Sequence, residues 1–161
     1  MIPENKKVEI EGAASGWILN DIGKGVYKVG YARSQKEYEM HFAKLYDALD
    51  KVDRMLENKK YLIGDKFTIV DLRLFQTLIR YDISYLVLFR CNKRAIRSYK
   101  NIHRYVKNLF HNESMRHTVN VEHIKRYYFL SPTELNPTGL IPAGPELWWE
   151  TQPDRSKGST K

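Results

Sequence analysis

The most regular pattern of apolar positions lies between Ser34 and Asn58. Apolar side chains recur there at alternating spacings of four and three residues, at Tyr38, Phe42, Leu45, Leu49, Val52 and Leu56. Such spacings place side chains on one face of an α-helix. Ser34 and Glu37 have the spacing of a capping box. The sequence therefore predicts a long helix that begins at Ser34, with its stripe in the core or at a dimer seam.

A second helix start lies at Thr68. Thr68 and Asp71 are spaced as a capping box, and Phe67 and Leu72 occupy the two positions of a hydrophobic staple. Apolar residues then cover much of the circumference of a helix predicted from Ile69 to about Phe89. A helix that is apolar on most sides lies at the centre of a fold.

Shorter helices are predicted from Ala13 to Ile22, from Asn101 to Phe110 and from Val121 to Tyr128. No pair of segments shows the period-two alternation that is typical of paired strands. The predicted fold class is therefore all-α.

The predicted helices group into one domain at residues 13–130, with a flexible lead at 1–12. Four proline residues between positions 132 and 145 block regular structure. We therefore expect 131–150 to form an extended segment packed on the domain. The polar end at 151–161 is expected to be disordered.

Composition narrows the class of protein. The chain has 161 residues, of which 42% are hydrophobic and 29% charged, as in ordinary globular proteins. No apolar run is long enough for a membrane span, and no secretory leader is evident. With one cysteine, no internal disulfide can form, which favours a reducing compartment. We expect a cytoplasmic protein without a membrane partner.

A net charge of +8 raises the question of nucleic-acid binding. Basic side chains are densest from Arg90 to Lys107, and several share one helix face. Tyr99 and Ile102 inside this stretch need burial, and no nucleic-acid motif accompanies it. We interpret the stretch as a turn and a solvated helix face, and we expect no nucleic-acid partner.

Several segments resemble the glutathionyl-hydroquinone reductases, the Xi class of glutathione transferases. The capping box at Thr68, which follows the sequence Tyr61-Leu-Ile-Gly64, is typical of the C-terminal domain of glutathione transferases in general. Matches to the Xi class follow in the family's order at residues 25–32, 71–82, 89–92, 123–128 and 136–145. The resemblance covers about residues 13–145 and implies the helical bundle of that C-terminal domain, with residues 25–32 as a loop.

The chain also departs from the family pattern. Members begin with a thioredoxin-like domain that carries a Cys-Pro-Trp motif and most of the glutathione site, and this sequence contains neither. Lys100 stands where the resemblance implies a proline, a change that we expect to be harmless. Pro132 stands where a histidine is implied, and it should alter the segment beyond the substrate pocket.

The resemblance implies an activity in which a cysteine thiolate reduces glutathionyl-hydroquinones, with glutathione as co-substrate. Tyr27 and Tyr128 match the family's substrate-binding tyrosines. A phenol donates a hydrogen bond while staying neutral at pH 7, and its ring offers an apolar face. The alternative is that both are ordinary half-buried tyrosines, and Tyr127 is the neighbouring alternative to Tyr128. Trp17 is expected to pack between helices rather than line the pocket.

The remaining candidates favour structural roles. Cys91 follows the central helix instead of opening one, and the resemblance places a non-catalytic cysteine there. Asp82 is expected to be a buried carboxylate that needs a partner. Five histidines, His41, His103, His111, His117 and His123, show no spacing typical of metal ligands. We therefore expect no catalytic residue, cofactor-binding residue or metal ligand in this chain.

Two hypotheses about function remain. In the first, the chain is the substrate-binding half of a glutathione-dependent reductase. Its partners are then a missing thioredoxin-like domain and a quinol, and the chain alone is inactive and binds glutathione negligibly. In the second, it is a free-standing helical module with an interaction or assembly role. The resemblance also makes a homodimer plausible.

Overall fold

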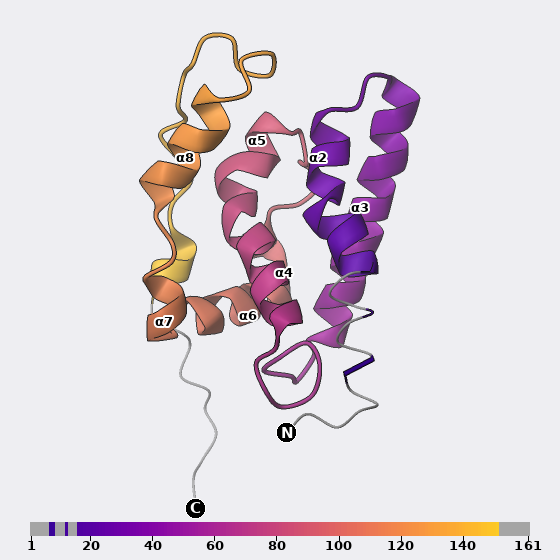
Figure 1. Ribbon diagram of the computed structural model, residues 1–161, viewed down its shortest axis with the longest axis vertical. Helices are drawn as coiled ribbons and strands as arrows, with labels where there is room; N and C mark the ends of the chain where they lie inside the picture. Colours follow the sequence, from indigo (N-terminus) through magenta and orange to yellow (C-terminus); the bar gives the residue numbers. More distant parts are fainter. Residues whose placement is uncertain (1–6, 9–11, 13–15, 152–161) are drawn as a thin grey trace, which may run out of the picture.

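The computed structural model describes residues 7–8, 12 and 16–151, and all regular elements among them are helical (Figure 1). This confirms the all-α prediction. The elements, with η denoting a π- or 3₁₀-helix, are η1 (Ile18–Gly23), α2 (Gly25–Gly30), α3 (Gln35–Met55), α4 (Ile69–Arg80), η2 (Tyr81–Tyr85), α5 (Leu86–Leu88), η3 (Ile96–Ser98), α6 (Lys100–Phe110), α7 (Glu113–Arg116), α8 (Val121–Leu130) and η4 (Trp148–Glu150).

Helix α3 begins where its capping residue predicts. The Ser34 hydroxyl accepts a hydrogen bond from the Glu37 N–H at 3.2 Å. The return bond of the expected box differs, because the Glu37 carboxylate accepts from the Arg33 N–H at 3.0 Å instead of from Ser34. Leu45 and Leu49 are fully buried within the single chain, so this part of the stripe belongs to the core.

The central helical run differs from the prediction in its middle. The capping box closes at its start, where Asp71 Oδ2 accepts from the Thr68 N–H at 2.9 Å. The α-helical pattern then ends at Arg80, and the π-helix η2 intervenes before α5. A π-turn rotates the following side chains relative to an α-helix, and all five residues of η2 are buried. The helical run ends at Leu88, close to the predicted end near Phe89, but its middle is a π-helix, which the prediction did not include.

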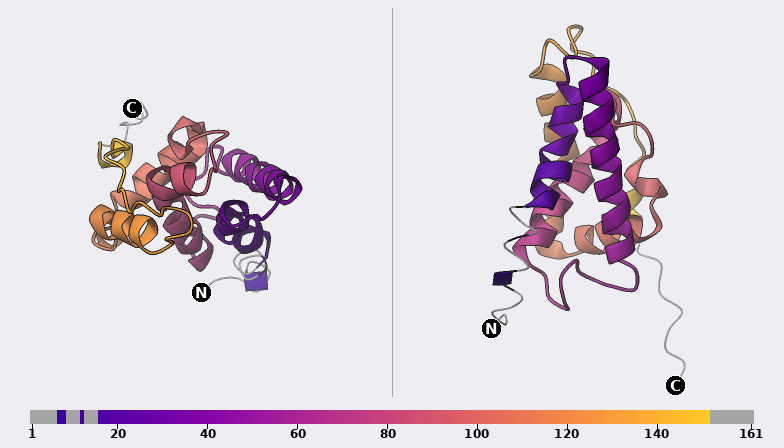
Figure 2. Two further views of the ribbon diagram at one scale, coloured as in Figure 1. Left: turned by 90° about the horizontal axis from the view of Figure 1, so that it is seen from above. Right: turned by 90° about the vertical axis from the view of Figure 1, so that its right-hand side faces the viewer.

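Residues 25–32 are a second correction, because α2 occupies most of what the resemblance implied to be a loop. Helix α2 packs against α3, and the two lie side by side along the bundle (Figure 2). Of the helix predicted from Ala13 to Ile22, residues 13–15 lie outside the described residues, and the rest joins η1. Helices α6 and α8 lie where they are predicted, and α8 continues to Leu130.

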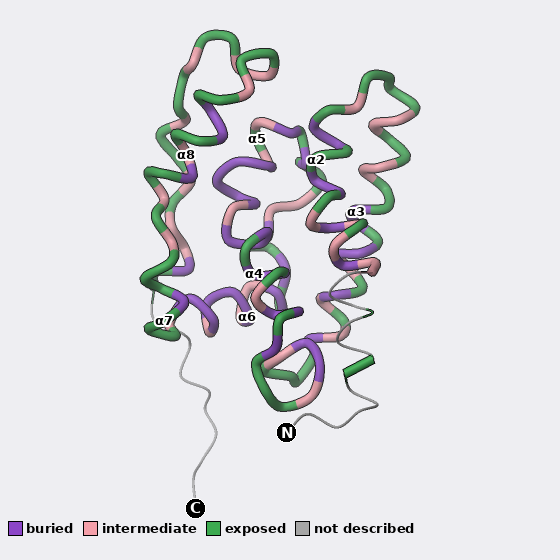
Figure 3. Tube along the Cα trace, viewed as in Figure 1, coloured by how far each residue is buried: buried purple, intermediate pink, exposed green. Residues whose placement is uncertain are grey.

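Buried positions concentrate where α4, η2 and α6 meet the surrounding helices (Figure 3). After α8, residues 132–147 contain no helix and return along the bundle to η4 (Figure 1). Trp149 of η4 is completely buried, so it fixes the end of this segment to the domain. Within the described part of the chain, no helix combines the length and the apolar character that a membrane span requires.

Candidate functional site

Three tyrosine hydroxyl groups from distant parts of the chain meet at one point. The hydroxyl oxygens of Tyr27 on α2 and Tyr128 on α8 lie 2.6 Å apart. The hydroxyl oxygen of Tyr85 on η2 lies 2.8 Å from that of Tyr128. We call Tyr27, Tyr85 and Tyr128 the tyrosine cluster. The structure thus brings together the two predicted site residues and adds a third.

Phe89 positions the rings of this cluster. The Tyr85 ring stacks on Phe89 with centroids 5.4 Å apart, and the Tyr27 ring lies 5.2 Å from Phe89. Gly30 permits this packing, because a Cβ at that position would lie only 2.4 Å from Phe89 Cγ. The absence of a side chain at Gly30 therefore lets α2, and with it Tyr27, approach the central helical run.

The direction of the hydrogen bonds follows from burial. Tyr85 is 3% exposed, Tyr128 6% and Tyr27 39%. Either oxygen of each pair can be the donor, and we infer the direction from burial: both buried hydroxyl protons find an acceptor when Tyr85 donates to Tyr128 and Tyr128 donates to Tyr27. Three phenols have three protons, and the two contacts use two of them. The proton of Tyr27 is therefore left to donate outward.

The two buried phenols of the cluster, Tyr85 and Tyr128, are neutral at pH 7. Burial is the main factor that raises the pKa of both Tyr85 and Tyr128 above the ordinary value of 10.0. Donation from Tyr128 to Tyr27 raises the pKa of Tyr128 further, and acceptance from Tyr85 lowers it. A neutral phenol remains a hydrogen-bond donor, so the cluster offers donation and not negative charge.

The tyrosine cluster borders a cleft of about 500 Å³. Besides the cluster, the cleft is lined by Gln76, Thr77, Arg80, His123, Ile124 and Tyr127. Its volume lies in the range of small-molecule sites. Among the described residues, no carboxylate lines it, whereas Arg80 and His123 are basic. The cleft therefore suits an aromatic ligand that carries hydrogen-bond acceptors.

The neighbouring candidates take different places. Tyr127 lines the same cleft and is 64% exposed, but its hydroxyl group is not part of the cluster. Trp17 is partly buried against the core, and the ammonium group of Lys51 lies 4.0 Å from its ring centroid. Trp17 does not line the cleft, in agreement with the predicted packing role.

Cys91 is unsuited to act as a nucleophile. Its side chain is completely buried, and burial raises the pKa of the thiol to about 12. The thiolate is the reactive form, so little of it exists near neutral pH. The side chain packs under α2, where its sulfur lies 4.0 Å from the Val26 carbonyl oxygen. This geometry agrees with the structural role predicted from sequence.

Asp82 finds its partners among neutral donors. Its carboxylate accepts from the Ile96 N–H at 2.7 Å, the Arg97 N–H at 3.1 Å and the Trp148 indole at 3.0 Å. Burial raises the pKa of Asp82, and these bonds oppose that change. Asp82 thereby joins η2 to η3 and η4, which is a structural role.

The histidines are dispersed. The His103 ring lies 4.6 Å from that of Trp148, and His111 Nε2 lies 2.9 Å from the Thr151 carbonyl oxygen. His41 and His117 lie near glutamates of their own helices. His123 lines the cleft. The residues described by the structure include no group of three or more potential ligands that could hold a metal.

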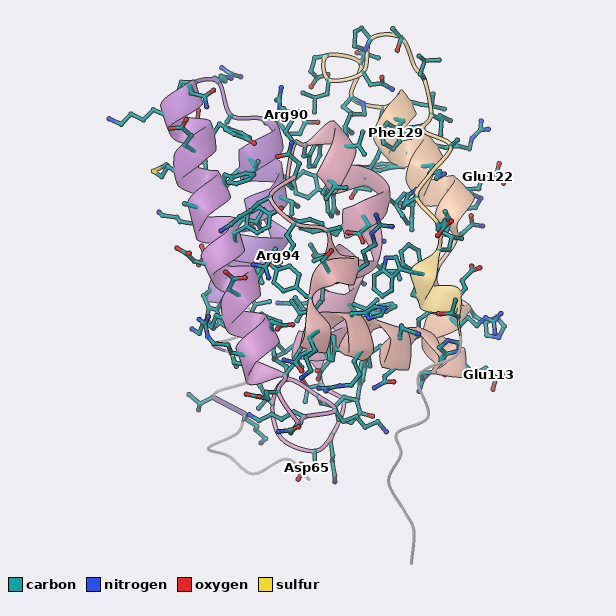
Figure 4. The ribbon with its side chains drawn as sticks, turned by 180° about the vertical axis from the view of Figure 1, so that it is seen from behind. Asp65, Arg90, Arg94, Glu113, Glu122 and Phe129 are labelled. Atoms are coloured by element: carbon teal, nitrogen blue, oxygen red, sulfur yellow. The ribbon has the colours of Figure 1, made fainter. Side chains whose placement is uncertain are left out.

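Contacts within the domain account for part of the basic stretch. Arg94 donates to Asp50 on α3 at 3.1 Å (Figure 4). Arg104 donates to the Leu56 carbonyl oxygen at 2.6 Å and so closes the end of α3. These two arginines have roles within the fold that need no external ligand.

Residues 35–108 match the family model described as "Glutathione S-transferase, C-terminal domain". The chain belongs to the glutathione transferase family, as a C-terminal domain. The curated relatives of this transferase domain include glutathionyl-hydroquinone reductases, which confirms the resemblance drawn from the sequence motifs.

Two such relatives are bacterial. Glutathionyl-hydroquinone reductase YqjG of Escherichia coli (strain K12) is 37% identical over 131 residues, which cover 81% of this chain and 40% of the relative. Glutathionyl-hydroquinone reductase PcpF of Sphingobium chlorophenolicum is 40% identical over 128 residues, which cover 80% of this chain and 41% of the relative. The transferase domain described here thus spans less than half the length of each.

Solved structures agree with this family. The glutathione-bound structure of YqjG from Escherichia coli K-12 superposes with a TM-score of 0.89 at 33% identity, over 95% of this chain and 49% of that one. The glutathione transferase Xi of Phanerochaete chrysosporium gives a TM-score of 0.87 at 40% identity, over 91% and 49% of the two chains. The helical bundle of the transferase domain is therefore the fold of these proteins' matching halves.

Sequence reasoning missed Tyr85, Arg80 and His123 as cleft residues. Tyr81, Tyr85 and Phe89 recur at spacings of four, a signal that indicated one face of a helix. It did not show that this face continues toward α8, because the π-helix was not foreseen.

Proposed function

We propose that this transferase domain is the substrate-binding half of a glutathione-dependent oxidoreductase that reduces glutathionyl-hydroquinones. The observation that carries the proposal is the tyrosine cluster, which presents one outward hydroxyl proton at a ligand-sized cleft. The names of the curated relatives support this substrate class. A quinol has the two features that the cleft selects, a flat ring and acceptor oxygens.

The cleft binds the quinol in two ways. The exposed rings of Tyr27 and Tyr127 contact the flat face of the substrate. The Tyr27 hydroxyl group donates to a quinol oxygen, while Tyr128 and Tyr85 hold it in place. Negative charge that develops on that oxygen during the reaction is stabilised by this donation, with Arg80 nearby.

The reactive sulfur comes from a thioredoxin-like domain, because Cys91 is buried and protonated. A thiolate of that domain attacks the glutathione sulfur and breaks its bond to the ring carbon. The electron pair and a proton go to the ring carbon, which releases the hydroquinone and leaves a mixed disulfide. A second glutathione thiolate attacks this disulfide, forms glutathione disulfide and restores the domain's thiolate.

Kinetics of a fused protein test the proposal. The chain alone should show no turnover of a glutathionyl-hydroquinone and negligible binding of glutathione. Fusion to the thioredoxin-like half of the Escherichia coli relative should restore turnover. Tyr27→Phe in the fused protein should lower kcat/KM by about tenfold, the effect of one lost hydrogen bond.

Tyr127→Phe is the matched control, since its ring lines the cleft outside the cluster, and it should leave kcat/KM within about twofold of the parent. Unchanged kinetics in the Tyr27→Phe fusion would remove Tyr27 from the site. Turnover by the chain alone that disappears with Cys91→Ala would contradict the assignment of the reactive thiolate to the thioredoxin-like domain. A folded fusion without turnover would favour the free-standing helical module.

A further inference from the structure

A second cleft of about 430 Å³ lies beside the tyrosine cleft, between α4 and the segment that contains α7 and α8. Its walls are mainly apolar and come from Leu72, Phe75, Ile79, Met115, Val119 and Ile124. We call this second cleft the apolar lobe. Four of these six side chains, those of Phe75, Ile79, Met115 and Ile124, are buried in the domain, and those of Leu72 and Val119 are partly buried.

The two clefts are adjacent and share part of their lining. Gln76, Arg80, His123 and Ile124 line both of them. Along α4, the lobe extends from Arg80 back to Leu72, a distance of about 12 Å at the rise of an α-helix. A ligand whose ring lies at the tyrosine cluster can therefore extend a substituent into the lobe without leaving the protein.

The chemistry changes along this path. Thr77 and four tyrosines line only the tyrosine cleft, whereas five apolar side chains line only the lobe, together with Thr118 and Asn120. Arg80 and His123 line both clefts. Neither cleft has a carboxylate in its lining, within the described part of the chain. Glu113 of α7 and Glu122 of α8 point away from the bundle (Figure 4). A ligand with a polar ring and an apolar chain matches this order.

Volume supports a substituted ligand. A cavity of about 150 Å³ already holds a benzene ring. The tyrosine cleft alone exceeds that volume about threefold, and the lobe nearly doubles the space. A bare single-ring quinol would leave most of it unfilled, and apolar walls without ligand contacts contribute nothing to affinity.

We infer that the apolar lobe binds an alkyl or isoprenoid-like chain on the quinol ring, so that the substrate class is chain-bearing quinols. This rests on the proposed function for the position of the ring. Each CH₂ group that the lobe removes from water improves affinity by up to about fourfold. A butyl chain has three more CH₂ groups than a methyl group, so its affinity should exceed that of the methyl compound by about tenfold and by no more than about sixtyfold.

The methyl group of Met115 is a built-in probe, since it belongs to the lobe wall. Naphthohydroquinones that carry a methyl, butyl or octyl substituent are titrated into the protein under anaerobic conditions. The methionine methyl resonances are followed by NMR. The butyl and octyl compounds should shift the Met115 resonance and the methyl compound should not. Met40 and Met55 on α3 are the internal controls and should stay unchanged with all three.

A pair of variants isolates the lobe. Val119→Arg places a cation at the lobe wall. It should remove the gain in affinity that the alkyl chain of the ligand provides, about tenfold, while the methyl compound still binds. Leu140→Arg is the control, because Leu140 is 72% exposed and lines a different apolar groove. Circular dichroism checks that both variants fold. If Val119→Arg does not fold, the shift of the Met115 resonance in the parent protein provides the test instead.

The outcomes separate the two proposals. If no naphthohydroquinone binds, the proposed function fails and this inference fails with it. If all three compounds bind equally and Met115 does not respond, only the lobe assignment is overturned. The chain-length effect should also persist in the fused protein. Its loss there would assign the lobe to the interface with the thioredoxin-like domain and would overturn the inference.

Discussion

The domain buries polar groups in two regions that differ in how their hydrogen bonds are used. At its base, the Asp71 carboxylate accepts from the Leu62 N–H, the Thr68 N–H and the Tyr105 hydroxyl, each at 2.9 Å. At the cleft, the tyrosine cluster bonds only within itself in the structure described. The carboxylate is thus saturated by its own protein, whereas the cluster keeps one proton for another molecule.

This difference separates a structural site from a binding site. Asp71 fixes the loop before α4 to α6, and removal of its bonds leaves buried donors without partners. The outermost phenol of the cluster contributes little to folding, because water can replace its outward bond. Loss of stability should therefore dominate at Asp71, and loss of binding should dominate at Tyr27.

The largest expected effect comes from Asp71→Ala. This change leaves the Leu62 N–H and the Thr68 N–H without their acceptor and leaves the Tyr105 hydroxyl only the Asp71 carbonyl oxygen at 3.4 Å, at a cost of about 3 kcal/mol in the free energy of unfolding. Denaturant unfolding followed by circular dichroism measures it. The exposed Asp47→Ala on α3 is the control and should stay within about 0.5 kcal/mol of the parent. Equal stability of the two variants would refute the structural role of Asp71.

Gly30→Ala should have the next largest effect, because it connects the core to the cluster. The new Cβ would overlap Phe89, and overpacking of this kind costs about 1–3 kcal/mol. Gly25→Ala in the same helix is the control, since its Cβ would meet Leu45 at an ordinary 3.6 Å. Thermal unfolding compares the two variants, and a loss no greater in Gly30→Ala than in Gly25→Ala would contradict this account of α2.

A smaller effect is expected from Tyr85→Phe and appears at alkaline pH. Burial raises the pKa of Tyr85 above 10.0, so above pH 10 the unfolded chain releases this proton while the folded chain keeps it. The stability due to this proton is complete below pH 10 and is lost as the pH rises. Above pH 10, the unfolding free energy of Tyr85→Phe should therefore fall less steeply with pH than that of the parent. The difference in slope should be up to about 1.4 kcal/mol per pH unit.

The same variant should lose only about 1 kcal/mol at pH 7, the value of one hydrogen bond. Denaturant titrations from pH 7 to about pH 11 provide both values. An identical slope in parent and variant would show that Tyr85 does not hold its proton in the folded state.

Local chemistry explains which parts of this molecule the sequence predicted. Ser34 and Thr68 set helix starts through bonds to residues three positions away, so the start of each helix can be read locally. Tyr27 and Tyr128 were identified through motif resemblance, which carries information about distant contacts. The role of Tyr85 depends on a π-turn and on packing against Phe89, and no local pattern encodes those.

The ends of elements were predicted less well for the same reason. The resemblance implied a loop where α2 forms, and the two glycines among the six residues of α2 do favour irregular backbone on local grounds. Burial of Val26 and Val29 against the core overrides that preference. Tertiary contacts at Phe89 thus decide both the helical state of this segment and the position of Tyr27.

The central claim is that the outward hydroxyl group of Tyr27 binds a quinol, and calorimetry tests it most directly. A naphthohydroquinone is titrated without oxygen into the parent chain, Tyr27→Phe and Tyr127→Phe, all with melting temperatures measured beforehand. We predict that Tyr27→Phe weakens binding about tenfold and lowers the free energy of unfolding by only about 1 kcal/mol, the value of the lost bond from Tyr128, while Tyr127→Phe binds like the parent. Equal affinity of the parent and Tyr27→Phe would contradict the account.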